Sequence, residues 1–155
     1  LLTMIKRILL FLILNFIALG IGSLFTGEGV PSEWYGNLNK APWTPPGWFF
    51  GVAWTSIMIC FAFYMAYLWP LIHNKKSLLG LFFIQWLLNI SWNPAFFYFH
   101  NILVGLIIII SLTMLIGFIF LHHISKLNAK SSLLLPYFIW LIIASSLNAY
   151  AYFMN

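Results

Sequence analysis

The fold is decided by the stretch Pro42-Trp43-Thr44-Pro45-Pro46-Gly47-Trp48-Phe49-Phe50-Gly51-Val52-Ala53-Trp54, where a long polar connection ends and a long apolar run begins. We expect Thr44 to cap a helix here and Pro45 to occupy its first position, because a missing N–H costs nothing there. Large apolar side chains then recur at helical spacing, at Phe50, Trp54, Ile57 or Met58, and Phe61. The stretch therefore predicts a helix that carries an aromatic face from the loop into the protein interior.

The composition is that of a membrane protein. Of 155 residues, 63% are hydrophobic and 6% are charged, whereas soluble domains contain about 25% charged residues. A helix needs about 20 apolar residues to cross a bilayer, and five such runs lie at about 5–25, 46–69, 78–100, 102–122 and 132–153. We therefore predict an all-α fold, an integral membrane bundle of five transmembrane helices, forming one domain over residues 1–155 with an exposed loop at 26–45.

The charges predict an orientation in the membrane. With five spans, six of the seven basic residues fall on one side, at Lys6, Arg7, Lys75, Lys76, Lys126 and Lys130. The other side holds Lys40 with both acids, Glu28 and Glu33. Basic residues favour the cytoplasmic side, so we expect a cytoplasmic N-terminus, with the C-terminus and the loop 26–45 outside. The net charge of +5 is then an orientation signal, and no nucleic-acid partner is expected.

The opening apolar run also resembles a secretory signal. Its cleavage would leave four spans, so we expect it to be retained as the first span of the bundle.

Amide side chains form a stripe on the third span. Gln85, Asn89 and Asn93 are four residues apart, which places them on one side of a helix. An amide facing hydrocarbon is costly, so the stripe must face either other helices or an internal cavity. On the fifth span, Trp140, Ala144 and Asn148 share a face, where the small residue beside a large ring indicates either close packing or a pocket.

The chemistry available inside the spans is limited to aromatic rings and a few amides. No Asp, Glu, Lys, Arg or His lies deep in a span, which argues against a proton-coupled pump and against acid–base hydrolysis. The four histidines lie at span ends, so no metal site is predicted. Trp54, Asn93 and Trp140 share the outer half of the bundle with the loop. We therefore expect an aromatic cavity under the loop, suited to a large, flat, mostly apolar ligand.

Several motifs resemble those of the TspO/MBR family, which comprises the tryptophan-rich sensory proteins, the translocator proteins and the peripheral-type benzodiazepine receptors. They are Trp34-Tyr35, Pro42 to Gly47, Gly51 to Trp54, Asn89-Ile90-Ser91-Trp92-Asn93-Pro94-Ala95-Phe96-Phe97 and Pro136 to Trp140. The resemblance implies a five-helix bundle, commonly a homodimer, that binds porphyrins, haem-type tetrapyrroles, sterols or isoquinoline and benzodiazepine drugs, with no obligatory cofactor.

The resemblance also implies roles for single residues. Trp54 and Asn93 would contact the polar centre of the ligand, while Phe96, Trp140 and Ala144 would line its pocket. Trp43 and Pro45 would belong to the covering loop, and Asn148 lies on the outer part of the fifth span. The expected ligand-binding residues are therefore Trp43, Pro45, Trp54, Asn93, Phe96, Trp140, Ala144 and Asn148. Trp34 and Tyr35 are expected to form a lid over the opening.

One departure from the family pattern concerns sterols. The animal members end the fifth span with a basic sterol motif, whereas residues 147–155 contain no basic residue here. The sequence therefore argues against sterol binding through this motif, and we expect the protein in a prokaryotic plasma membrane.

Three hypotheses for function follow. The leading one is a membrane receptor or sensor for tetrapyrroles with a regulatory or stress-related role. The second is an enzymatic function. In bacterial members similar to this chain, the tryptophans that match Trp54 and Trp140 are associated with light- and oxygen-dependent breakdown of protoporphyrin. The third is passive translocation of such a ligand across the bilayer.

Overall fold

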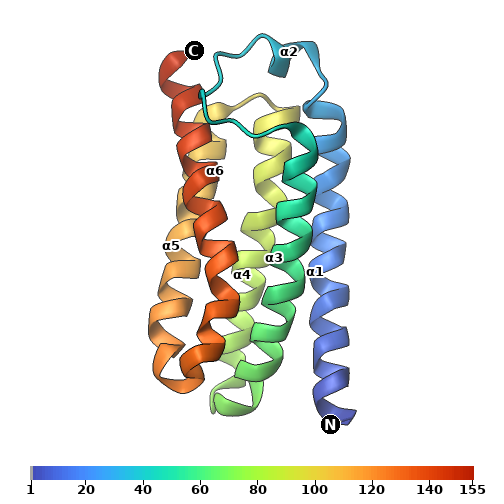
Figure 1. Ribbon diagram of the computed structural model, residues 1–155, viewed down its shortest axis with the longest axis vertical. Helices are drawn as coiled ribbons and strands as arrows, with labels where there is room; N and C mark the ends of the chain where they lie inside the picture. Colours follow the sequence, from blue (N-terminus) through green and yellow to red (C-terminus); the bar gives the residue numbers. More distant parts are fainter. Residues whose placement is uncertain (1) are drawn as a thin grey trace.

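The computed structural model describes residues 2–155, with side chains from Thr3 onward, and its long helices lie side by side in one bundle (Figure 1). In chain order, the elements are α1 (Leu2–Gly29), α2 (Glu33–Gly36), α3 (Gly47–Leu68), the 3₁₀ turn η1 (Trp69–Leu71), α4 (Lys75–Asn93), the π-helical turn η2 (Pro94–Tyr98), α5 (Ile102–Leu127), the 3₁₀ segment η3 (Asn128–Leu134) and α6 (Leu135–Met154). No strand occurs within residues 2–155. The prediction of an all-helical bundle is confirmed.

The helices are long and apolar enough for a membrane. Three stretches of the described chain meet this criterion: Thr3–Gly29, Gly47–Leu71 and Ile102–Met154. The last stretch contains both α5 and α6, which run in opposite directions on either side of η3 (Figure 1). α4 is not among them, which we attribute to the amides it carries, but it packs between α1 and α5 within the bundle. The protein is therefore an integral membrane helical bundle.

The helix after the polar loop begins later than the sequence predicts. Thr44 does not cap it, since its hydroxyl donates to the Ala41 carbonyl at 2.7 Å. The N-cap is Pro46, and the helix begins at Gly47. The reason is the second proline: a residue that precedes a proline is disfavoured in the helical region, so Pro45 cannot be a helical residue. The chain stays extended through Pro46, whose ψ is 154°.

The loop itself is shorter and more structured than the predicted range of 26–45. α1 continues past residue 25 as far as Gly29, and the four-residue α2 follows. Ser32 caps α2, because its hydroxyl accepts a hydrogen bond from the Tyr35 N–H at 3.2 Å. The polar composition of this region marks the end of α1 and the start of α2 rather than a continuous loop.

The amide stripe of α4 bonds to neighbouring helices. The Tyr137 hydroxyl on α6 donates to Gln85 Oε1 at 2.8 Å and accepts from Asn89 Nδ2 at 3.1 Å. The third amide, Asn93, faces α1, where the Thr26 hydroxyl donates to its Oδ1 at 2.5 Å. Hydrogen bonding between helices is thus the explanation for Gln85 and Asn89, whereas Asn93 also lines a cavity that is described below.

The end of α4 widens into a π-helical turn. Pro94 has no N–H to continue the α-helical pattern, and the Phe99 N–H bonds back to the Pro94 carbonyl at 2.9 Å. His100 then takes a positive φ of 53°, and the Asn101 side chain caps α5 by accepting from the Val104 N–H. This turn buries Phe96 and Phe97 and reverses the chain within three residues, from Phe99 to Asn101.

α1 packs against the π-helical turn through a glycine, and this contact can be tested. A Cβ at Gly29 would lie closer than 3.0 Å to the Phe97 ring, whereas a Cβ at Gly27 would meet nothing within 4 Å. We expect Gly29→Ala to reduce the free energy of unfolding by about 1–3 kcal/mol, the usual cost of overpacking. Thermal unfolding of the purified protein in detergent measures this change. Gly27→Ala is the matched control and should behave as wild type. Equal stability of both variants would contradict the close approach.

Candidate ligand site

Aromatic rings gather in the half of the bundle that lies under the α2 loop. Trp140 on α6 meets Phe50 and Trp54 on α3 with centroid separations of 5.5 and 6.5 Å, in both cases edge to face. Trp92 on α4 stacks on Phe96 at 5.6 Å. Edge-to-face and offset stacked pairs are the favoured arrangements of aromatic rings. The cluster is therefore rigidly packed, and the free space lies at its margins in two small cavities.

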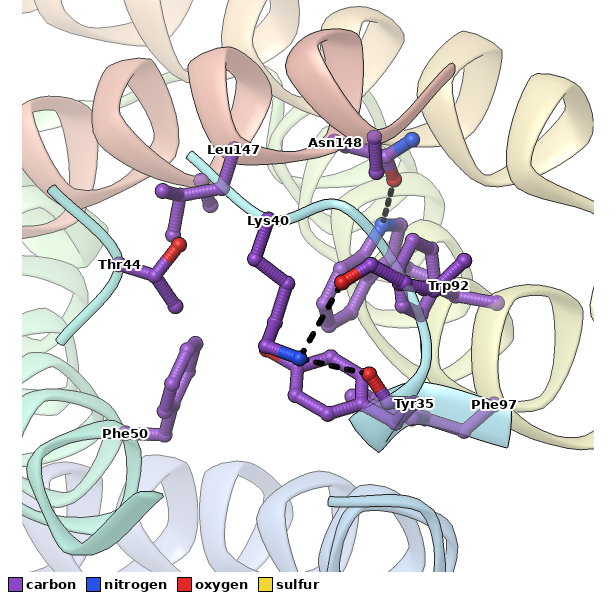
Figure 2. A pocket seen from close by; sticks show the side chains of 12 residues that line it. Tyr35, Lys40, Thr44, Phe50, Trp92, Phe97, Leu147 and Asn148 are labelled. Atoms are coloured by element: carbon purple, nitrogen blue, oxygen red, sulfur yellow. Dashed lines mark hydrogen bonds between the residues drawn. The ribbon is translucent and has the colours of Figure 1, made fainter. Parts of the chain in front are cut away.

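The first cavity, which we call the lid cavity, lies beneath the α2 loop (Figure 2). Its walls come from the loop, α3, the end of α4 and α6, and include Tyr35, Lys40, Phe50, Trp92, Phe96, Phe97, Ala144 and Asn148. The space open to the centre of a water-sized sphere is about 30 Å³. A single water needs about 10–15 Å³ on this measure, so the cavity holds no more than a few waters in this conformation.

The polar groups of the lid cavity are paired within the chain. The Trp92 indole N–H donates to Asn148 Oδ1 at 2.9 Å, and Asn148 Nδ2 donates to the Ile102 carbonyl at 2.9 Å. At the mouth, Lys40 Nζ donates to the Tyr35 carbonyl at 2.7 Å and lies 4.7 Å from the centre of the Tyr35 ring (Figure 2). Lys40 thereby closes the loop over the cavity and is the one cationic side chain that lines it.

The second cavity, which we call the α1 cavity, lies between α1, α3 and α4. Its lining includes Ala18, Gly22 and Thr26 on α1, Phe50 and Trp54 on α3, and Asn89 and Asn93 on α4. The space open to a water-sized sphere is about 50 Å³. Gly22 lets α1 approach closely, because a Cβ there would come within 2.6 Å of Asn93 Nδ2.

Phe50 separates the two cavities, since it lines both of them. The sequence predicts a single cavity, but the structure divides the expected residues. Trp54 and Asn93 line the α1 cavity, while Phe96, Ala144 and Asn148 line the lid cavity. Phe50 lines both cavities, and its ring is held there by edge-to-face packing on Trp140.

Trp140 lines neither cavity but lies behind Phe50. It is 5% exposed, and its indole N–H is fully covered without a hydrogen-bond partner among the described residues. A buried donor without a partner costs about 1–3 kcal/mol. Trp140 is thus an unpaired hydrogen-bond donor within the aromatic cluster.

The residues predicted as a lid cover the cluster in two different ways. Trp34 stacks on His100 with a centroid separation of 4.0 Å and an interplanar angle of 8°, and it meets Phe96 at 5.5 Å. Tyr35 meets Phe97 at 5.5 Å and lines the lid cavity. Burial raises the pKa of the Tyr35 hydroxyl, so this group is a neutral phenol at ordinary pH. The lid is therefore held on the π-helical turn by ring contacts.

Trp43 and Pro45 lie further from the cavities than the sequence predicts. The Trp43 indole N–H donates to the Ser146 hydroxyl at 3.0 Å, and its ring packs against Tyr150, but 54% of the residue is exposed. Pro45 is half-buried and lines neither cavity. Both residues attach the loop to α6 or extend it toward α3, and neither contacts the enclosed space.

Sequence reasoning missed several lining residues. Trp92 and Phe97 belong to the motif Asn89 to Phe97 but were not expected to bind a ligand, although each lines the lid cavity. Sequence reasoning also assigned Lys40 only to membrane orientation and Thr26 only to the loop. The position of Lys40 as the sole basic residue on its side of the membrane was an available signal for a role in the loop. Nothing in the sequence pattern indicated that Thr26 faces Asn93.

The site offers binding groups rather than acid–base groups. Apart from Lys40 and Tyr35, neither cavity is lined by a titratable side chain. Within the described residues, no group of three His, Cys, Asp or Glu side chains is placed to hold a metal ion. The walls of the two cavities are aromatic rings, small residues and amides, which is the lining typical of a site for an apolar ligand with a few polar contacts.

Comparisons with known proteins agree with this picture. The model of the TspO/MBR family matches residues 9–154. A tryptophan-rich protein TspO from Archaeoglobus fulgidus is 37% identical over 147 residues, covering 92% of this chain and 94% of that protein. Protein CrtK from Rhodobacter capsulatus is 30% identical and covers 86% of this chain and 83% of its own length. The human translocator protein is also 30% identical, over 83% of this chain and 78% of its own. With a family match over nearly its whole length, the chain belongs to the TspO/MBR family.

Proposed function

We propose that this protein is a membrane receptor or sensor that binds a porphyrin or related tetrapyrrole in the aromatic cluster under the α2 loop, with a regulatory or stress-related role. The observation that carries the proposal is the unpaired Trp140 N–H, which lies behind Phe50, a residue that lines both cavities. A ligand with an acceptor group that displaced Phe50 would join the cavities and satisfy this donor. Isoquinoline and benzodiazepine drugs are expected to use the same space.

Size requires that the ligand site opens. Sites for drug-sized ligands measure about 300–1,000 Å³, whereas the two cavities offer about 30 and 50 Å³. We infer that the described conformation is closed to a ligand of this size. Rotation of Phe50 would connect the cavities, and lifting of the α2 loop would admit a flat ring system between Trp54 and Phe96. The rings would then stack on the ligand as they now stack on each other.

Polar edges of a tetrapyrrole would find suitable partners. Porphyrin carboxylates at the mouth would meet Lys40, whose Nζ now bonds only to main-chain carbonyls of the loop. Polar atoms of the ligand deeper in the site would meet Asn93, beside Trp54. These polar groups favour a ligand whose ring system carries anionic or other polar groups over a simple hydrocarbon.

The setting of the protein is part of the same proposal. We infer that the end carrying η1 and η3 faces the cytoplasm, because six of the seven basic residues lie at that end of the bundle. The α2 loop and the C-terminus would then lie outside a prokaryotic plasma membrane, and the protein would work there as a homodimer. A ligand would reach the lid cavity from the outer side.

Trp54→Ala and Asn93→Ala test the ligand site. Each is expected to weaken binding of protoporphyrin at least tenfold, because each removes a wall of the α1 cavity that the ligand would enter. Quenching of tryptophan fluorescence during titration of the purified protein measures the affinity. Trp48→Ala is the matched control, since Trp48 is 70% exposed and lines neither cavity. The proposal fails if both test variants fold and bind as the control does.

His100→Asn tests the lid. Asparagine tolerates the positive φ of 53° at this position but removes the ring on which Trp34 stacks. Because the stacking no longer holds the loop, the loop should open more often, and the association and dissociation rates of protoporphyrin should both rise severalfold. Stopped-flow fluorescence measures both rates, and His73→Asn at the opposite end is the control. Unchanged rates in His100→Asn would show that loop opening does not limit entry.

One observation favours the enzymatic alternative. Trp54 lies edge to face with both Trp140 and Tyr137, at 6.5 and 6.0 Å, so three oxidisable rings are in contact beside the α1 cavity. Illumination of bound protoporphyrin in the presence of oxygen is expected to bleach it faster in wild type than in the Trp54→Phe, Trp140→Phe double variant. Absorbance of the porphyrin follows the reaction, and an equal rate in a variant that still binds would remove the enzymatic function.

A further inference from the structure

A groove at the opposite end of the bundle collects most of the histidines of the chain. It lies between the start of α4 and the end of α5, and three of the four histidines line it, His73, His122 and His123, together with Lys126. About 470 Å³ of it is open to a water-sized sphere, compared with 30 Å³ in the lid cavity. The groove is therefore much wider than the lid cavity at the other end of the bundle.

His123 directs an unpaired polar atom toward this groove. The residue is 3% exposed, and its Nδ1 lies 2.8 Å from the Ile119 carbonyl. A carbonyl can only accept, so Nδ1 carries the hydrogen. Nε2 makes no hydrogen bond with any described residue and is not among the fully covered atoms. His123 lines the groove, so Nε2 is the ring nitrogen left to meet a bound group. Protonation of the ring makes Nε2 a donor, and an anion beside it would favour that form.

The chain supplies no counter-charge at this end. Its two acids, Glu28 and Glu33, lie on α1 and α2 at the loop end. The start of α4 adds the positive end of a helix dipole, followed by Lys75 and Lys76 instead of an acid. Lys75 bonds to the carbonyls of Trp69 and Ile72, whereas Lys126 makes no hydrogen bond or ring contact with the described residues. A surplus of positive charge thus faces outward without a partner in the protein.

The placement of the histidines is not explained by membrane orientation. Lys and Arg determine the side on which a loop remains, and Lys126 near the end of α5 also offsets the helix dipole. Neither effect requires imidazoles in a groove. The groove also has an apolar lining, formed by Ile72, Leu81 and Phe118, and Phe118 is 51% exposed.

We propose that this groove binds an anionic phospholipid. The phosphate would lie among His73, His122 and Lys126, above the buried His123, and an acyl chain would run along Phe118 and Leu81. Basic pockets between transmembrane helices are a known way to bind anionic headgroups, and the apolar wall distinguishes a lipid from a free phosphate. The site is separate from the ligand site under the loop, so its failure would leave the proposed function unaffected.

Binding of short-chain phosphatidylglycerol to the purified full chain in neutral detergent tests the proposal. Native mass spectrometry gives the affinity, with phosphatidylcholine and glycerol 3-phosphate as comparison ligands. Wild type is expected to prefer phosphatidylglycerol to both by at least tenfold. Lys126→Gln should weaken that binding about fivefold, the usual effect of one basic residue near a membrane surface, and His122→Gln should weaken it as well.

Lys130→Gln is the matched control, because Lys130 lies at the same end but over the Tyr67 ring and outside the groove. It should change the affinity less than twofold. Should Lys126→Gln fail to fold, His73→Gln makes the same test from the α4 side. If Lys126→Gln and Lys130→Gln lose the same affinity for phosphatidylglycerol, the binding depends only on surface charge and the proposed site is wrong. Equal affinity for phosphatidylcholine or for glycerol 3-phosphate would overturn the lipid assignment.

Discussion

The constraint on which this structure depends is that polar groups inside a bilayer must pair within the protein. α4 carries several of them, and their partners lie on α1 and α6. Gln85 and Asn89 share the Tyr137 hydroxyl on α6, and Asn93 accepts from Thr26 on α1. The Trp92 indole reaches Asn148, which in turn bonds to the first residue of α5. These bonds fix the rotation and register of α4, which is the least apolar of the long helices and would gain least from lipid contact.

The same constraint places the site. The paired groups run up α4 to the π-helical turn. Between α3 and α6, aromatic rings meet instead, with Phe50 and Trp54 against Trp140. Rings of this size leave gaps that small residues such as Ala18, Gly22 and Ala144 do not fill. Cavities therefore form where the amide network gives way to aromatic packing. Trp140, whose N–H finds no acceptor there, marks that boundary.

Much of this architecture could be predicted from the sequence, because in a membrane chain apolar length and charge placement determine the helices. The amide stripe and the aromatic face of α3 were predictable from helical spacing. The predicted helix start was wrong by two residues, because Pro46 disfavours a helical conformation at Pro45 and the helix begins only at Gly47. The division of the cavity by Phe50 could not be predicted, because spacing places a ring on a face but does not say whether it fills the space it faces.

The late start of α3 links the lid to the partition between the cavities. Phe50 lies in the first turn of α3, where main-chain N–H groups lack helical partners, and the Phe49 N–H bonds instead to the carbonyl of Pro46 in the loop. The extended segment before it lines the lid cavity at Thr44 and is attached to α6 by Trp43. A movement that lifts the loop must therefore pull on the turn that holds Phe50. Under the proposed function, opening of the lid and joining of the cavities would therefore be one conformational change, in which a ligand enters only as Phe50 moves aside.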